Sequence, residues 1–359
     1  MKVLFIPGRE PSYSRNSIIV KGMRRNNIHV VECSKESKWS IVRYISVLFQ
    51  FLKKRRQNID LVIVGFFGQP LVPLIKRLTD KPIILDAFMS GYQTLVFDKK
   101  RIRVDSRIAK ILWNLDKKSC ELADKVLLDT AQHCRYFSKE FNIPLDKFER
   151  LWIGADDDVF FPRDKKDSNK FIIEFHGNFV PLQGVHNIIR AAKLLEDDPD
   201  IHFIIIGSGQ TYSLCRQIAK SLHLKNISFL GRRPNTEIPN YLSSTDVGLG
   251  TFANSQKNRM VHTSKTFEVI AMRVPLINAC TPASQELFTH MKNVYFCKPS
   301  DPASLANAIK ELKKNKALRK KIAYGGYKLF KKEATPSILG KRIKEICEDV
   351  LRVQEIKNH

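Results

Sequence analysis

A lysine and a glutamate, Lys265 and Glu268, stand three residues apart at the start of a predicted helix within the stretch Met260–Glu286. The apolar residues after Lys265 recur at helical spacing until Pro275, and a buried strand follows. A carboxylate near a helix N-terminus can accept hydrogen bonds from hydroxyls, and the first N–H groups of a helix attract anions. These residues therefore offer an acceptor for hydroxyls and a cationic cradle for phosphate. An exposed Glu–Lys pair at helical spacing is the alternative.

The elements around this stretch alternate between strand and helix in both halves of the chain. Such a pattern is typical of parallel sheets covered by helices on both faces, so we expect an α/β fold with two parallel-sheet lobes. A ligand would bind in the cleft between the lobes, at the carboxyl ends of the strands. The predicted strands are Lys2–Ile6, Ile28–Val31, Leu61–Val64, Pro82–Leu85, Lys125–Leu128, Phe171–Phe175, Phe203–Ile206, Ile227–Leu230, Val247–Leu249 and Leu276–Ile277.

A polar segment, Leu151–Lys170, marks the border between the lobes, because it has a proline, an acidic cluster and a charged run without periodicity. We place the N-terminal lobe at residues 1–160 and the C-terminal lobe at residues 161–335. A C-terminal helix over residues 336–359 is expected to return to the N-terminal lobe. The acidic cluster Asp156–Asp158 invites a metal site. Three consecutive carboxylates on regular structure cannot all face one ion, so a solvated linker or helix cap is favoured.

The composition points to two domain cores and an anionic partner. The chain has 359 residues, of which 43% are apolar, and a net charge of +25. This is enough apolar material for two cores, and the charge favours a nucleotide, a nucleic acid or an acidic lipid surface. Seven scattered cysteines without CxxC spacing indicate reduced thiols in the cytoplasm. Neither a signal peptide nor an apolar run of about 18 residues is found, so no membrane span is expected.

A turn with a glycine follows the first predicted strand. Gly8 comes directly after Pro7 and is a candidate phosphate-binding residue. The GxGxxG pattern of dinucleotide-binding turns is absent, so close packing between strand and helix is the favoured interpretation of this glycine.

Five segments of the second half occur in the order and roughly the spacing of a known family. They are HGNFVPLQGVHNIIRAAKLL, FIIIGSGQ, ISFLGRRPNTEIPNYLSSTDVGL, SKTFEVIAMRVPLINACTPASQELF and PSDPASLANAIKELKKN. Through them the chain resembles the retaining nucleotide-sugar glycosyltransferases with two Rossmann-like lobes, which have the GT-B fold and form glycosyltransferase family 4, of the group 1 type. The linker GADDDVFFP and the first-lobe segments REPSYSRN and LDAFMSGYQT also resemble parts of this family.

The resemblance implies a role for each residue that matches a family motif. Glu268 matches the glutamate that holds the ribose hydroxyls of the donor, and Lys265 matches a basic position near the diphosphate. The loop from Gly177 through Asn178 to Gly184 approaches the phosphates with its backbone. The turn formed by Gly231 and Arg232 lies beside the base. A departing nucleoside diphosphate gains negative charge, which N–H groups and cations stabilise without a metal ion, so no metal or cofactor is expected.

Several positions depart from the family pattern. Met260 stands where a second glutamate contacts the sugar, and Asn178 and Gln183 stand where the phosphate loop often has Arg and Lys. Asp86 and Ser90 follow the first-lobe strand after which many members have a histidine. Either the donor is held differently, which we favour, or the fold has lost its activity. The missing positive charge can come from Arg259 and Lys265, which precede the helix.

The segment Lys38–Arg56 combines bulky apolar residues with cations at both ends. An interfacial helix on anionic lipid would show this pattern, with aromatic residues at the boundary and Lys or Arg toward the headgroups. A buried helix of the first lobe is the alternative interpretation. The apolar residues are Trp39, Val42, Ile45, Phe49 and Leu52. The run Lys99–Arg103 is interpreted as a solvated surface.

The sequence therefore predicts an enzyme, a retaining hexosyltransferase that moves a sugar from a nucleotide-sugar donor to an acceptor. Arg259, Lys265 and Glu268 are the candidate catalytic residues. The expected acceptor is a carbohydrate or lipid-linked precursor of a cell-envelope polysaccharide, met in the cytoplasm at the inner face of an anionic membrane. A non-catalytic nucleotide-sugar-binding protein is the alternative. A nucleic acid is not expected, because zinc spacing, aromatic-rich RNA motifs and recognition-helix patterns are absent.

Overall fold

The computed structural model describes residues 1–34, 40–165 and 168–358. The chain divides into two compact units. Unit 1 comprises Met1–Gly154 and Thr335–His359, and unit 2 comprises Ala155–Ala334. The border thus lies a few residues before the predicted one at residue 160. Lys38 and Trp39 of the predicted interfacial helix, and residues 166–167 of the predicted linker, lie outside the described residues.

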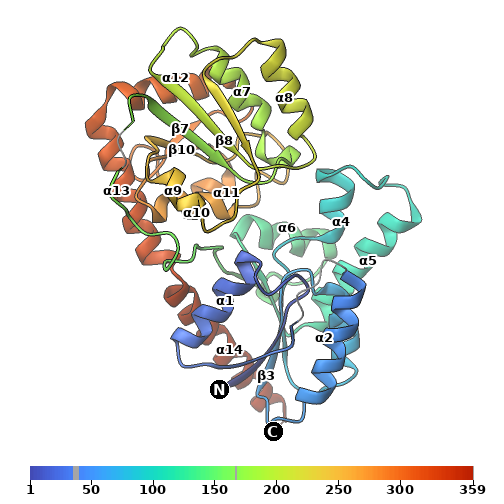
Figure 1. Ribbon diagram of the computed structural model, residues 1–359. Helices are drawn as coiled ribbons and strands as arrows, with labels where there is room; N and C mark the ends of the chain where they lie inside the picture. Colours follow the sequence, from blue (N-terminus) through green and yellow to red (C-terminus); the bar gives the residue numbers. More distant parts are fainter. Residues whose placement is uncertain (35–39, 166–167, 359) are drawn as a thin grey trace. The chain divides into compact units, whose positions relative to one another are not determined.

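Unit 1 is built on a parallel sheet with the strand order β2-β1-β3-β4-β5-β6 (Figure 1). β6 is absent from the sequence prediction, because Phe148 is the one apolar residue of its sequence FER. The strands are β1 (Lys2–Ile6), β2 (His29–Glu32), β3 (Leu61–Val64), β4 (Ile83–Asp86), β5 (Lys125–Leu128) and β6 (Phe148–Arg150). The helices are α1 (Ser14–Arg25), α2 (Ser40–Lys54), η1 (Gln69–Leu71), α3 (Val72–Lys76), α4 (Gly91–Gln93), η2 (Thr94–Asp98), α5 (Arg107–Leu122), α6 (Ala131–Phe141), η3 (Leu145–Lys147) and α14 (Pro336–Asn358).

Unit 2 repeats this architecture with the strand order β12-β11-β10-β7-β8-β9, and its strands are also parallel. The strands are β7 (Phe171–His176), β8 (Ile201–Ile206), β9 (Ile227–Gly231), β10 (Val247–Leu249), β11 (Leu276–Ala279) and β12 (Tyr295–Cys297). The helices are η4 (Pro181–Gln183), α7 (Val185–Lys193), α8 (Tyr212–Ser221), α9 (Ile238–Leu242), α10 (Ser264–Ala271), α11 (Pro282–Gln285), α12 (Pro302–Lys314) and α13 (Lys316–Glu333). The prediction of two parallel-sheet, Rossmann-like lobes is confirmed.

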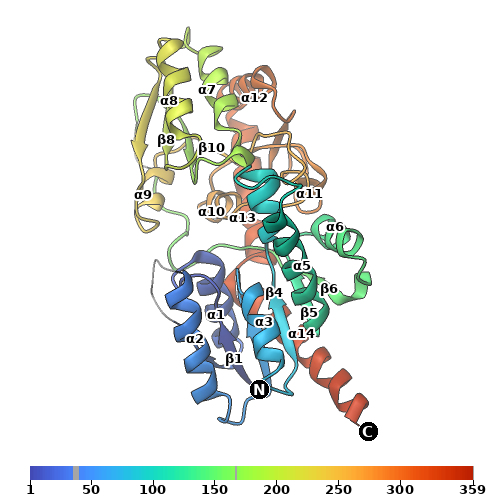
Figure 2. The same cartoon turned by 90° about the vertical axis from the view of Figure 1, so that its right-hand side faces the viewer.

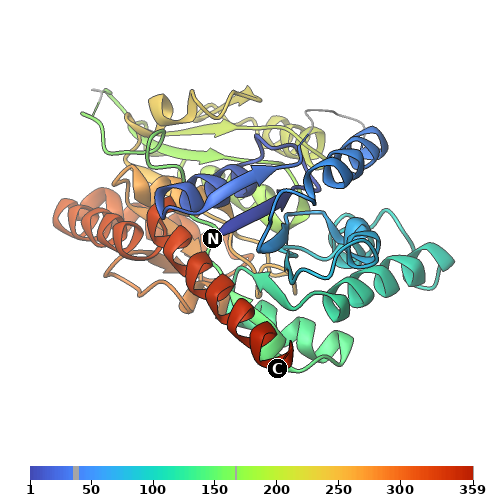
Figure 3. The ribbon, with the colours of Figure 1, turned by 90° about the horizontal axis from the view of Figure 1, so that it is seen from below.

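Helices cover both faces of the unit 1 sheet. Side chains alternate along a strand, and Leu4 and Ile6 of β1 belong to a core that also holds Val47 of α2, Ile75 of α3 and Cys120 of α5. Helices α2, α3 and α5 follow one another across this face (Figure 2). Helix α14 packs along α1, and both lie on the other side of the strands (Figures 1 and 3).

The same alternation decides which residues of β7 face α10 in unit 2. Phe171, Ile173 and Phe175 point into the core that holds α7, α8 and α12. Glu174 and His176, which alternate with them, therefore point to the opposite face of the sheet. Helix α10 packs against β10 and β11. Two ionisable side chains are thus directed into the layer between the strands and α10.

Helix α2 has one buried face and one exposed apolar face. Its buried face includes Val47 and Arg43, and the Nε atom of Arg43 donates to the carbonyl oxygen of Gly8 at 2.9 Å. The exposed face consists of large apolar side chains that are 40–66% exposed, namely Val42, Ile45, Phe49 and Leu52. The alternative of a buried helix therefore describes only half of its surface. Among the described helices, none is long and apolar enough to cross a bilayer.

Two glycines allow α14 to approach α1 closely. A Cβ atom at Gly340 would lie 1.9 Å from the carbonyl oxygen of Gly22, and one at Gly22 would lie 2.4 Å from that of Pro336. The terminal helix is therefore fixed to unit 1 by direct backbone packing.

Gly340→Ala should for this reason destabilise the protein, although alanine normally stabilises a helix interior relative to glycine by roughly 0.5–1 kcal/mol. We expect a loss of about 1–3 kcal/mol from overpacking, measured by urea unfolding. Lys341→Ala, at the exposed neighbouring position, is the control and should be close to neutral. A Gly340→Ala variant as stable as the parent would contradict this account of the packing.

Candidate functional site

A histidine and two glutamates form a buried cluster in unit 2. Glu174 and His176 lie on β7, and Glu268 lies on α10. The Nδ1 atom of His176 lies 3.0 and 3.1 Å from the two carboxylate oxygens of Glu174, and its Nε2 atom lies 2.8 Å from Oε2 of Glu268. All three residues are buried. An imidazole held between two carboxylates therefore joins the sheet to α10.

The two carboxylates determine the protonation state of the histidine. A carboxylate only accepts hydrogen bonds, so both ring nitrogens of His176 must donate, which requires the imidazolium form. Burial lowers the pKa of His176, but Glu174 and Glu268 together raise it by more, to about 9. His176 is therefore a buried cation at neutral pH.

Lys265 is a buried basic residue beside this cluster. Its Nζ atom donates to the side-chain oxygen of Gln183 and, at 3.1 Å, to the carbonyl oxygen of Gly250. The same atom lies 3.6 Å from the centre of the Phe175 ring. Burial lowers the pKa of Lys265 well below its usual value, and the charges of Glu174 and Glu268 oppose that shift. Because Lys265 and Glu268 are both buried, the alternative of an exposed Glu–Lys pair is excluded.

Glycines end three neighbouring strands next to these side chains. Gly177 follows β7 with φ +144°, Gly207 follows β8 with φ +136°, and Gly231 ends β9 with φ +68°. The N–H of Gly207 donates to the carbonyl of Gly231 at 2.8 Å, and a Cβ atom at Gly207 would lie 1.8 Å from the carbonyl oxygen of Gly177. A Cβ atom at Gly177 would lie 3.3 Å from Cε of Lys265. The three glycine positions at this edge therefore present backbone alone, and Gly177 lies beside the side chain of Lys265.

The predicted phosphate loop continues from this edge to α7. Gly184 has φ +64°, and a Cβ atom there would lie 2.5 Å from the backbone nitrogen of Ala253. The loop also carries Gln183, which binds Lys265. Gly177, Gly184 and Lys265 are thus brought together, as the resemblance implies.

The N-terminus of α10 lies beside the same cluster. Thr263 is its N-cap residue and makes no side-chain hydrogen bond to the first turn, and within the described part of the chain its buried Oγ1 atom has no hydrogen-bond partner. The end of a helix that is not capped by a side chain attracts anions through its N–H groups.

The remaining predicted residues of unit 2 differ in accessibility. The side chains of Arg259, Asn178 and Arg232 are exposed, whereas Met260 is buried. Arg259 lies on the loop before α10, and its carbonyl oxygen accepts a hydrogen bond from the N–H of Ala283 at 3.1 Å. These exposed residues can reach a ligand from solvent, but they do not belong to the buried cluster.

Close packing accounts for Gly8 in unit 1. A Cβ atom at this position would lie 2.1 Å from the backbone carbon of Phe67. The structure thus supplies the packing reason that the sequence favoured for this glycine. A phosphate-binding role for Gly8 stays a prediction.

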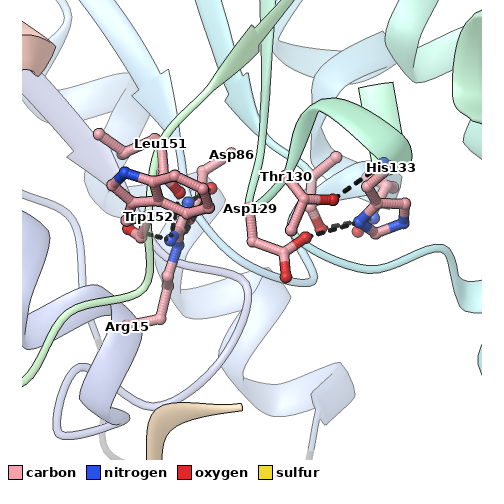
Figure 4. A network of polar contacts seen from close by, with 9 residues as sticks. Arg15, Asp86, Asp129, Thr130, His133, Leu151 and Trp152 are labelled. Carbon is pink, nitrogen blue, oxygen red and sulfur yellow. Dashed lines mark hydrogen bonds and ion pairs between the residues drawn. The ribbon is translucent and has the colours of Figure 1, made fainter. Parts of the chain in front are cut away.

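A buried ion pair occupies the carboxyl end of β4. Arg15 on α1 donates from Nη2 to Oδ1 of Asp86 at 2.7 Å and from Nε to Oδ2 at 3.0 Å. Its Nη1 atom donates to the carbonyl oxygens of Leu151 and Trp152 at 3.1 and 2.9 Å (Figure 4). Asp86, one of the two residues that stand where many members of the resembled family have a histidine, thus binds α1 through Arg15. Arg15 also joins α1 to the backbone at Leu151 and Trp152.

A buried histidine nevertheless stands at the next strand end. His133 on α6 places Nδ1 at 2.8 Å from Oδ1 of Asp129, and its N–H donates to the Thr130 hydroxyl at 2.9 Å (Figure 4). Ser90 caps α4 and donates to Asp116 at 2.6 Å. Both arrangements organise connections at the carboxyl edge of the unit 1 sheet.

The acidic cluster Asp156–Asp158 forms a turn in which one ligand oxygen of each residue lies within 4.8 Å of the others. The carboxylates thus approach one another more closely than regular structure would allow. Asp156 accepts a hydrogen bond from the N–H of Asp158 at 3.1 Å. The expectation of a solvated linker or helix cap rather than a metal site stays a prediction.

The sequence analysis missed Glu174 and His176. One signal for them was present, because Glu174 interrupts the apolar strand FIIEFH. A carboxylate inside a strand that is buried on both faces needs a buried partner, and a cation or a hydrogen-bond donor was therefore to be expected nearby.

The two six-stranded parallel sheets define the GT-B fold, and solved structures show the same arrangement. HepE from Anabaena, in complex with UDP, superimposes with a TM-score of 0.74 over 97% of this chain and 100% of that one, at 13% identity. Residues 156–329, nearly all of unit 2, match the family model of the glycosyl transferases group 1. Unit 2 is therefore similar to the glycosyl transferases group 1 over nearly its whole length.

Curated relatives align over part of their length. The uncharacterized glycosyltransferase MJ1178 of Methanocaldococcus jannaschii is 28% identical over 158 residues, which are 44% of this chain and 42% of that protein. The capsular polysaccharide biosynthesis glycosyltransferase CapM of Staphylococcus aureus is 20% identical over 231 residues, 59% of this chain and 58% of CapM. The chain thus spans about half the length of these relatives.

The raised pKa of His176 predicts how stability depends on pH. An unfolded histidine titrates near about 6.5, so the imidazolium stabilises the fold fully below that pH and loses its effect as pH rises to about 9. The free energy of unfolding of the parent should fall by roughly 3 kcal/mol more across this window than that of His176→Asn, followed by urea unfolding at several pH values. His202→Asn, on the neighbouring strand β8, is the control and should follow the parent. Parallel curves for parent and His176→Asn would contradict the assignment.

Proposed function

We propose that this protein is a glycosyltransferase that moves a sugar from a nucleoside-diphosphate sugar to an acceptor, with retention and without a metal ion. The observation that carries the proposal is the position of Lys265 and Glu268 at the start of α10, buried beside the glycine edge at Gly177. The group 1 match of unit 2 and the fold shared with HepE support it.

Each part of this site suits one part of the donor. The Glu268 carboxylate accepts hydrogen bonds from the ribose hydroxyls. The uncapped N-terminus of α10 and the backbone at Gly177 approach the diphosphate without side chains between them. Lys265 and the exposed Arg259 add positive charge. As the bond between sugar and phosphate breaks, the leaving diphosphate gains negative charge, and these fixed donors stabilise it.

A nucleotide-sugar-binding protein without catalysis is the alternative, and Met260 favours it. This residue is buried where the related pattern has a glutamate toward the sugar. Thermal stabilisation by UDP, GDP, ADP and their sugars would identify the ligand, since a ligand at about 100 times its dissociation constant stabilises by roughly 2.7 kcal/mol. Slow hydrolysis of the donor sugar without acceptor would distinguish the enzyme from the binding protein. A chain that no nucleotide stabilises would contradict both.

Lys265→Met should lower turnover far more than it weakens binding of a nucleoside monophosphate. Methionine fills a similar volume against Phe175, whereas loss of the charge removes stabilisation that matters most as the diphosphate leaves. We expect a loss of about 100-fold or more in kcat. Arg259→Ala should act in the same direction, and Arg232→Ala, which removes another exposed cation, is the comparison.

The same assay tests the metal-free mechanism. Turnover should persist in the presence of a chelator. Activity that disappears with chelator and returns with a divalent ion would overturn that part of the proposal.

The acceptor side of the proposal concerns the first lobe. In GT-B enzymes the acceptor enters mainly through that lobe, and the exposed apolar face of α2 ends in cations. Lys53 and Arg56 are exposed, whereas Lys54 and Arg55 also bind carbonyl oxygens within unit 1. Acidic lipid attracts each nearby cation by about 1 kcal/mol, and apolar side chains can insert at the headgroup boundary. We therefore propose a lipid-linked or polysaccharide precursor as acceptor, met at the inner membrane face.

The protein should sediment with anionic vesicles at low salt and be released as the Debye length falls below about 8 Å. The double variant Ile45→Gln, Phe49→Gln should sediment less. Val353→Gln, Ile356→Gln is the matched control, because these residues are similarly exposed but belong to α14, a different helix. A parent protein that ignores anionic vesicles at low salt would favour a soluble acceptor instead.

A further inference from the structure

The carboxylate proposed to hold the ribose is itself held by a residue with no assigned role. Glu268 receives the Nε2–H of His176 at 2.8 Å on its Oε2 atom. A carboxylate has two oxygens and about four acceptor positions, so this bond leaves capacity for a ribose diol. His176 in turn is fixed by both oxygens of Glu174, at 3.0 and 3.1 Å.

The bridge restricts Glu268 to one orientation. A glutamate side chain has several rotatable bonds, and its rotamer entropy opposes any ordered contact. His176 comes from β7 rather than from α10, and its ring is clamped at both nitrogens. The position of the Glu268 carboxylate is thereby fixed relative to the sheet. Gly177, at the proposed phosphate edge, is the residue that follows His176 in the chain.

The bridge also places a positive charge between two buried carboxylates. Glu174 and Glu268 are both removed from water, and the imidazolium of His176 donates to each of them. Removing one partner of a buried charged group leaves the others uncompensated, so the two carboxylates depend on this shared donor.

We propose that His176 is a positioning residue for the nucleotide, which orients the Glu268 carboxylate toward the ribose hydroxyls. This inference rests on the proposed function. It adds that recognition of the ribose depends on His176 and on Glu174, which fixes the histidine ring.

The test compares binding of UDP with binding of 2′-deoxy-UDP by calorimetry, or of GDP or ADP with the matching deoxy analogue if the thermal screen selects that base. The full chain should prefer the ribonucleotide by about tenfold or more, the effect of a hydrogen bond to a charged acceptor. His176→Asn should lose most of this preference, and so should Glu174→Gln. His202→Asn should keep it, because the ring of His202 bonds the Ser228 hydroxyl on β9, at 2.8 Å, rather than Glu268.

The pH dependence provides a second readout that a merely structural residue would not move. The groups that face His176 are Glu174 from β7 and Glu268 and Lys265 from α10. The preference of the parent for the ribonucleotide should decline as pH rises through about 9, where the imidazolium is lost. In His176→Asn it should be small at every pH.

The outcomes separate this inference from the function on which it rests. If the parent prefers the ribonucleotide and His176→Asn, folded at neutral pH by circular dichroism, keeps that preference, the role of His176 is refuted while the proposed function stands. If His176→Asn fails to fold, His176→Gln, which retains one amide donor, is used in its place. A His176→Gln variant that keeps the full preference for the ribonucleotide at every pH refutes the positioning role of His176. A parent that binds no nucleoside diphosphate overturns both.

Discussion

The arrangement of unit 2 depends on burying four charges together. Glu174, His176, Lys265 and Glu268 come from one strand and one helix, and none of them could be buried alone, since an isolated ion inside a protein costs several kcal/mol. Their mutual contacts make the layer between β7 and α10 possible. The edge beside them must then be free of side chains, which the glycines after β7 and β8 provide. Methionine is the informative replacement for Lys265, because it keeps the volume against Phe175 while it removes the amine.

The loop before α7 is joined to α10 by one side-chain contact. It has Gln183 at a position where the resembled family often has a basic residue, and Nζ of Lys265 donates to that glutamine from α10. The helix thus brings a basic side chain to this position of the loop. In unit 1, Asp86 forms an ion pair with Arg15. The buried histidine of that sheet edge is His133 on α6, which contacts Asp129. Both units keep polar residues at the carboxyl ends of their strands, where parallel sheets present open loops.

The sequence predicted the fold well, because apolar strands alternate with helices over most of the chain, as in Lys2–Ile6 and Leu61–Val64. It did not predict β6 or β12, although β10, which is equally short, was predicted. At the site, helix spacing placed Lys265 and Glu268 correctly at the start of α10, but whether they are buried depends on partners that are about 90 residues away in the chain. Glu174 and His176 are visible only as polar residues in an apolar strand, and local sequence does not say which element faces them. For α2, likewise, the local sequence does not say which of its apolar residues pack against the sheet and which stay exposed.

The central claim is that Glu268, held by His176, binds the ribose of a nucleoside diphosphate at the edge formed by Gly177. A crystal structure of the protein soaked with UDP tests this most directly. The account predicts both ribose hydroxyls within about 3.2 Å of the Glu268 carboxylate, with the bond from His176 retained and the diphosphate at the N-terminus of α10. A nucleotide bound at another place, with the Glu268 carboxylate still closed off behind His176, would contradict it.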